Sequence, residues 1–160
     1  MLLLTTARAR LTLNNSTGGT PLSSEKGARY FNFMKIKIEV DFDLGFGVWL
    51  RNQRIRLAGI DTPEIRTSDK EMKAMGKAAL AGLIDVLDDY SGSLIIRTEL
   101  DPNDKFGRIL GHVQTGGGID VNKWMIERNY AVAYDGKSKV NLEQLHRGNA
   151  TKLRERGEIL

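Results

Sequence analysis

The chain has 160 residues, no cysteine, two histidines and a formal net charge of +4. This length predicts one compact domain, and hydrophobic (41%) and charged (28%) fractions are typical of a globular protein. Lack of cysteine excludes disulfides, thiolate zinc sites and cysteine nucleophiles, and two histidines leave little for a histidine metal cluster or a Ser/His/Asp triad. No apolar run approaches the roughly 20 residues that a membrane-spanning helix needs, so no membrane contact is expected.

The first 33 residues are predicted to be a poorly structured or atypical extension, and residues 34–160 are predicted to be the folded domain. Residues 1–30 show no sustained period of 2 or 3.6, and their four basic residues against one acid supply +3 of the net charge. The rest of the chain is nearly neutral. Overall basicity is therefore weak evidence for a nucleic-acid partner, and the compartment, secreted or cytoplasmic, stays open.

The elements expected in chain order follow from hydrophobic periodicity and turn residues. They are strands at 34–43, 48–50 and 54–60, a helix through 72–87, strands at 93–98 and 108–115, and helices through 121–126 and 142–153. Ser68 with Glu71 is typical of a capping box for the first helix, and Asp120 and Asn141 are the expected caps of the other two. Leu145 is expected on the apolar face of the last helix.

The order of these elements predicts an α+β chain that is mainly β. Five short strands, one helix after the third strand and no alternating βα units favour a small barrel over a doubly wound sheet.

The densest polar cluster is the segment 54–64, which ends in two carboxylates around a proline. Asp61 and Glu64 stand three residues apart, and Pro63 restricts the turn between them. Such a pair suits a hard, oxygen-liganded cation such as calcium or magnesium, because one acid can bind the metal while the other acts on a water molecule. The structural alternative is a strand end capped by Asp61 and Thr62 and followed by a solvated acid.

A second cluster, 104–108, places Arg108 at the start of a strand just after a turn. Arginine binds phosphate in a bidentate way and stabilises charge that builds up on a phosphoryl group. Taken alone, an arginine at this place is more often a solvated strand start. Beside Arg56 across the sheet, Arg108 would form a phosphate clamp. Tyr134 could stack on a base or pack at the rim of the barrel.

In order and spacing these segments resemble the staphylococcal nuclease (thermonuclease) family. The likeness rests on 56–64, on 104–108 and on the stretch from Val121-Asn122 to 130–134, and it runs from about Met34 to the C-terminus. It implies a five-stranded OB-fold barrel with three helices, and a calcium-dependent enzyme that cleaves phosphodiester bonds in DNA and RNA.

The resemblance also implies a metal site and a base. Asp61 would bind calcium through its carboxylate and Thr62 would bind it through its backbone carbonyl. Glu64 would orient or deprotonate the attacking water.

The same resemblance implies a substrate site. Arg56 and Arg108 would contact the phosphate and stabilise the charged transition state, and Lys105 and Tyr134 would contact the bound nucleotide. Phosphoryl transfer needs charge neutralisation and an in-line water more than a covalent nucleophile, which agrees with these residue types.

One departure from the family concerns the second carboxylate ligand. The family opens its first strand with Asp-Gly-Asp-Thr, which is absent here, and the ligand position falls at about Ile36. Asp41 and Asp43 are close in sequence but would point to the opposite face of the strand unless a bulge shifts the register. Losing one carboxylate should weaken calcium binding. We hypothesise that residues 1–33 replace the authentic start of the domain.

Three hypotheses follow for the function. The first is a monomeric, calcium-dependent nuclease with weakened activity that acts on DNA or RNA, preferably single-stranded. The second is a catalytically impaired, nuclease-like module that binds single-stranded nucleic acid or protein. The third is an OB-type structural domain that acts through protein contacts.

Overall fold

The computed structural model describes residues 6–11, 36–88, 93–100, 109–136 and 140–160. The elements, in chain order, are β1 (Thr6–Leu11), β2 (Ile38–Asp43), β3 (Trp49–Leu57), β4 (Ile60–Asp61), α1 (Lys70–Asp88), β5 (Ser93–Leu100), β6 (Ile109–Thr115), α2 (Val121–Glu127), β7 (Val132–Ala133) and α3 (Leu142–Glu155). None of the helices in these ranges is both long and apolar enough to cross a bilayer.

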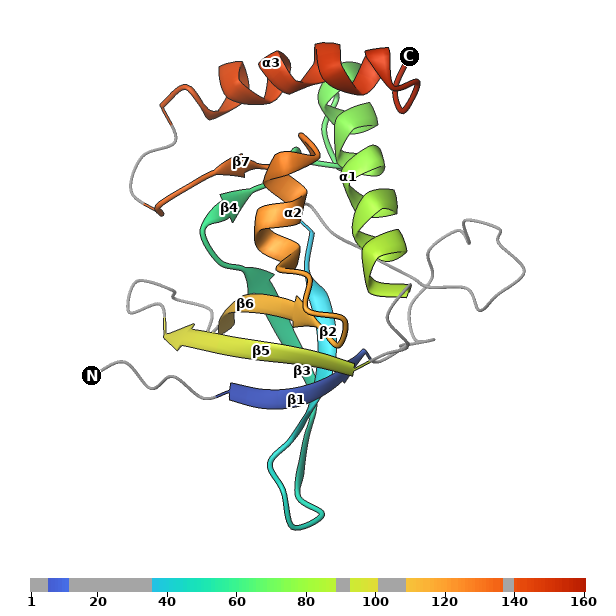
Figure 1. Cartoon of the computed structure of the whole chain (residues 1–160). Helices are drawn as coiled ribbons and strands as arrows, with labels where there is room; N and C mark the ends of the chain where they lie inside the picture. Colours follow the sequence, from blue (N-terminus) through green and yellow to red (C-terminus); the bar gives the residue numbers. More distant parts are fainter. Residues whose placement is uncertain (1–5, 12–35, 89–92, 101–108, 137–139) are drawn as a thin grey trace.

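The strands form one larger sheet and a separate pair. The larger sheet has the order β1-β2-β3-β6-β5, and β1 also pairs with β5, so the pairings run around a ring. Only the β3–β6 pairing is parallel, while β4 and β7 form a short antiparallel pair of their own. Figure 1 shows α1 and α2 on one side of the larger sheet, with α3 across their far ends beside β4 and β7.

The N-terminal extension differs from the prediction in one segment. Residues 6–11 form β1, which pairs antiparallel with both β2 and β5. Without β1, the edges of β2 and β5 would each present a row of unpaired backbone N–H and C=O groups. Pairing with these groups makes residues 6–11 a strand, although their part of the sequence shows no sustained apolar period. The remainder of residues 1–33 lies outside the described residues.

The strand prediction also fails between Val48 and Ile60. Trp49–Leu57 is one continuous strand rather than two, and a turn at Ala58 and Gly59 separates it from β4. Asn52 has a φ of 56°, a left-handed value that asparagine tolerates better than most residues, so the strand continues through the predicted loop.

A bulge in β3 lies opposite Asp41 of β2. Between the pairs Val40–Gln53 and Phe42–Leu50, β2 has one residue and β3 has two. Asp41, the single residue on β2, is buried. Its carboxylate accepts hydrogen bonds from the Asn52 backbone N–H at 2.9 Å and from the Arg51 guanidinium. Asp41 therefore stabilises the β2–β3 hairpin.

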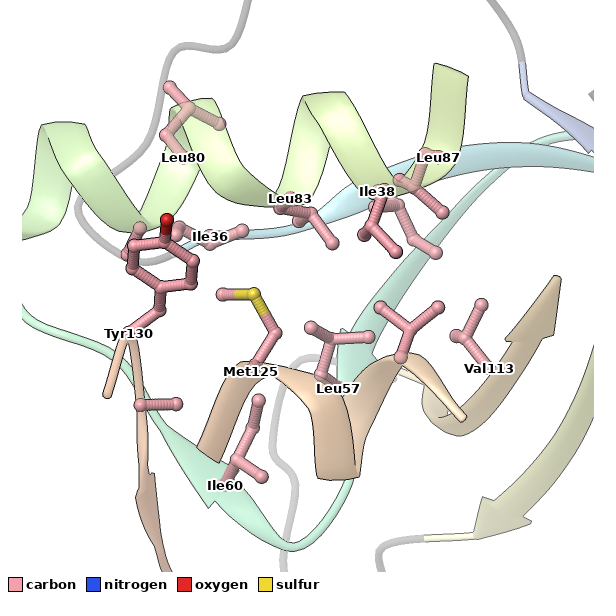
Figure 2. Close-up of a cluster of buried hydrophobic side chains, with 14 of the residues drawn as sticks. Ile36, Ile38, Leu57, Ile60, Leu80, Leu83, Leu87, Val113, Met125 and Tyr130 are labelled. Carbon is pink, nitrogen blue, oxygen red and sulfur yellow. The ribbon is translucent and has the colours of Figure 1, made fainter. Parts of the chain in front are cut away.

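The hydrophobic core lies between the sheet and the helices. Apolar side chains of α1, of α2 and of the inner faces of β2, β3, β5 and β6 form one cluster. Figure 2 shows Ile36 among these side chains, between Leu80 of α1 and Tyr130, and Ile36 is only 5% exposed. Tyr130 also packs closely on Gly82, where an added Cβ would lie 2.4 Å from the ring. The position implied for the second carboxylate is therefore part of the core.

The helix caps match the prediction at one of three positions. Asp120 caps α2 by accepting a hydrogen bond from the Lys123 N–H at 3.0 Å. The first helix is capped by Asp69 rather than Ser68, because the Asp69 carboxylate accepts the Met72 N–H. Asn141 stands at the N-cap of α3, but its φ of 71° is left-handed and its side chain makes no capping hydrogen bond.

The α+β class with three helices is confirmed, and the arrangement of strands and helices fits an OB-like fold. The shared core of α1, α2 and the sheet is what holds the β3–β4 turn, and with it Asp61, Thr62 and Glu64, in a defined place.

Candidate active site

The polar segment begins at the turn between β3 and β4. Gly59 has a φ of 71°, a left-handed value that glycine adopts without steric cost, and the turn directs the chain into the β4–β7 pair. In that pair Asp61 lies opposite Val132, and the Tyr134 N–H donates to the Gly59 carbonyl at 2.9 Å. The segment after β7 therefore holds the turn that leads to Asp61.

Asn122 fixes the same turn from the other side. It is buried in α2, and its amide nitrogen donates to the carbonyls of Ala58 (2.8 Å) and Gly111 (3.0 Å). Its amide oxygen accepts the Val113 N–H at 3.0 Å. One side chain thus connects the end of β3 with β6 and α2, and it satisfies buried backbone groups at their junction.

The chain after Asp61 packs tightly against α1. A Cβ at Gly76 would lie 2.9 Å from the Pro63 carbonyl oxygen and 3.1 Å from the Glu64 carbonyl carbon. Only glycine allows this approach, so helix α1 presses directly on the backbone that carries Glu64. The position of Glu64 therefore depends on α1 as well as on Pro63.

An open cavity of about 350 Å³ lies between this segment and α3. Its lining residues come from β4, from the β4–α1 connection, from the first turn of α1 and from the first two turns of α3: Asp61, Thr62, Glu64, Thr67, Asp69, Met72, Leu142, Glu143 and His146. Four of them are carboxylates and one is a histidine. The lining is therefore suited to a cation or to hydrogen-bond donors, and a bare phosphate would be repelled from it.

Asp61 and His146 form a buried pair inside the cavity. The His146 Nε2 atom lies 3.0 Å from the Asp61 Oδ2 atom, and both side chains are more than nine-tenths buried. An ionised carboxylate only accepts hydrogen bonds, so Nε2–H is the donor. The His146 Nδ1 atom is buried without a hydrogen-bond partner in the described residues. The pair joins β4 to α3 across 85 residues of sequence.

Arg147, next to His146, holds α3 against the start of α1. Its guanidinium donates to Asp69 (2.6 Å), Glu71 (2.8 Å) and Glu143 (2.7 Å), and Arg154 also contacts Glu71. The Met72 backbone N–H and Arg147 lower the pKa of Asp69, and these acids raise the pKa of Arg147. The network therefore stays ionised at neutral pH and neutralises two of the carboxylates that line the cavity.

The predicted catalytic and metal residues are brought together in part. Asp61, Thr62 and Glu64 line the same cavity, with Asp61 and Thr62 buried and Glu64 half-buried. Arg56 is half-buried on β3, opposite Leu110 of β6, and does not belong to the lining.

The predicted nucleotide contacts are less well defined by the structure. Tyr134 is half-buried beside Gly59 and is also outside the cavity lining. Lys105 and Arg108 fall outside the described residues, so their roles stay predictions.

His146 is one of the cavity residues that the sequence analysis did not assign to the site, together with Thr67, Asp69 and Glu143. The apolar face of α3 was expected to include Leu145, but Leu145 is 52% exposed and His146 is buried. The buried positions Leu142, His146 and Ala150 recur every four residues, which is the spacing of one helix face. That periodicity was the available signal for His146.

The fold is OB-like and α+β, and comparison with known families identifies it as a nuclease-type domain. The chain belongs to the staphylococcal nuclease family, because the family model described as staphylococcal nuclease homologue matches residues 54–155. No curated protein matches the chain.

Members of this family typically depend on calcium, but the described residues do not fit a calcium site. Calcium takes six to eight oxygen ligands, and Ile36 stands in the core where the second carboxylate is implied. The Asp61 carboxylate already accepts a hydrogen bond from His146. Within the described ranges, no group of three or more His, Cys, Asp or Glu side chains is placed to hold a metal ion.

Proposed function

We propose that the chain is a nuclease-type phosphodiesterase that hydrolyses DNA or RNA, preferably single-stranded, with low turnover. The observation that carries this proposal is that Asp61, Thr62 and Glu64 line one cavity in a chain of the staphylococcal nuclease family. The ring of five strands serves as the OB-fold barrel that supports the site.

In this proposal Glu64 orients or deprotonates the attacking water. Among the described residues, no hydrogen bond or ion pair engages its carboxylate, and the side chain is half-buried at the cavity, which suits a general base. Asp61 has its carboxylate held by His146 and so keeps a fixed position beside Glu64.

The phosphate is held by arginines. Arg56 lies on β3, and Arg108 directly precedes Ile109, which pairs with Ile55 on β3. Two guanidinium groups would offset the negative potential of the cavity and stabilise the charge of the transition state. Tyr134 and Lys105 contact the nucleotide.

A cleavage assay with a matched pair of variants tests the proposal. Single-stranded DNA and RNA oligonucleotides are incubated with the wild type, Glu64→Gln and Glu143→Gln, in millimolar calcium and in chelator. Loss of a general base costs on the order of 100-fold or more in rate, so Glu64→Gln should fall by that factor. Glu143→Gln removes a charge from the same cavity and should stay within a few-fold. Equal rates in the wild type and Glu64→Gln would exclude this mechanism.

The alternative is a binding module without turnover. It is favoured by the burial of Ile36 at the ligand position and by the hydrogen bond that already engages Asp61. Fluorescence anisotropy on the same oligonucleotides separates the two functions, since binding in chelator without cleavage in calcium supports the module.

A further inference from the structure

The Asp61–His146 hydrogen bond occupies the one buried carboxylate that lines the cavity. Asp61 belongs to β4 and His146 to the second turn of α3, and their side chains are 7% and 3% exposed. The hydrogen bond between them is 3.0 Å long and connects an imidazole to a carboxylate. Charge-assisted hydrogen bonds of this kind are about twice as strong as neutral ones.

A cation that displaces the His146 N–H from Asp61 Oδ2 breaks this hydrogen bond. The His146 Nδ1 atom is already buried without a partner in the described part of the chain. If Nε2 also lost its acceptor, the whole imidazole would be left unsatisfied inside the protein, which carries a desolvation penalty. The penalty lowers the affinity for the cation.

We infer that His146 determines the cation affinity of this site by withholding Asp61 from divalent cations. His146 is a positioning residue that acts through Asp61 and does not contact the substrate. The inference deepens the proposed function and rests on it, with Asp61 as the metal-binding carboxylate that the family resemblance implies. It also explains the misfit with calcium by a residue that the family motif does not contain.

The test measures cation binding directly. Calcium is titrated into the wild type and His146→Leu by isothermal calorimetry, and the shift of the melting temperature with calcium concentration is recorded in parallel. A hydrogen bond to a charged group is strong enough that its removal should tighten calcium binding about 10-fold or more. His112→Leu is the matched control: His112 pairs with Glu99 outside the cavity, and its loss should leave calcium affinity unchanged.

Two further variants distinguish the effect of the N–H donor on calcium affinity from the effect of the histidine ring. His146→Gln keeps an N–H near Asp61 and should bind calcium with an affinity close to that of the wild type. The side chain of His146→Asn is too short to reach Asp61, so this variant should bind calcium with the affinity of His146→Leu. It serves as the test variant if His146→Leu does not fold.

Unchanged calcium affinity in His146→Leu, or no binding by any variant, would overturn the inference. Weaker binding in that variant would also overturn it, because His146 would then be a cation ligand itself. If binding tightens as expected while no variant cleaves nucleic acid, the inference stands and the proposed nuclease activity falls.

Discussion

Replacing Asn122 by alanine should destabilise the protein more than any exposed substitution. The change leaves the Val113 N–H and the Ala58 carbonyl buried without their present partner. The Gly111 carbonyl is spared, because it still accepts the Ala58 N–H at 2.9 Å. At about 1–3 kcal/mol for each unsatisfied group, less a few tenths for the higher helix propensity of alanine, the expected loss is about 3 kcal/mol.

Thermal and urea unfolding followed by circular dichroism measure this loss. For a chain of this size, about 3 kcal/mol corresponds to a fall of roughly 6–12 °C in Tm. Asn149→Ala is the control, since Asn149 is half-buried in α3 and its hydrogen bonds are 3.3–3.4 Å long. If Asn122→Ala and Asn149→Ala lose the same free energy of unfolding, Asn122 does not hold the β3–β4 turn as argued.

Two further predictions concern stability. Phe46 is fully exposed and has a left-handed φ of 53°. Asparagine adopts this conformation more readily, so Phe46→Asn should raise the free energy of unfolding by about 0.5–1 kcal/mol. A lower free energy of unfolding in urea titration would show that Phe46 makes compensating contacts. Burial, with the neighbouring Glu158, raises the pKa of Tyr130 from 10 to about 12. The folded state thus retains the phenol proton longer, so this stabilisation is complete below pH 10 and is lost as pH rises towards 12. Urea midpoints should fall over that range in the wild type, and the same fall in Tyr130→Phe would contradict the assignment.

The sequence by itself determined the part of the site whose residues are close together in the chain. Asp61, Thr62 and Glu64 share one turn, and Pro63 restricts it, so their common cavity follows from their spacing. Asp120 was predicted as a cap for the same reason, because a cap contacts N–H groups two or three residues away. Membership of the family was likewise predicted from the order and spacing of the motifs.

Contacts between distant segments were decided only in the tertiary structure. The role of His146 depends on α3 packing over β4, and its partner Asp61 is 85 residues away. Strand β1 exists through pairing with the edges of β2 and β5, and Asp41 is buried opposite a bulge in β3, where it accepts the Asn52 N–H. Periodicity within one segment carries no information about which distant backbone or side chain will satisfy it, since that partner is selected by the packing of the whole chain.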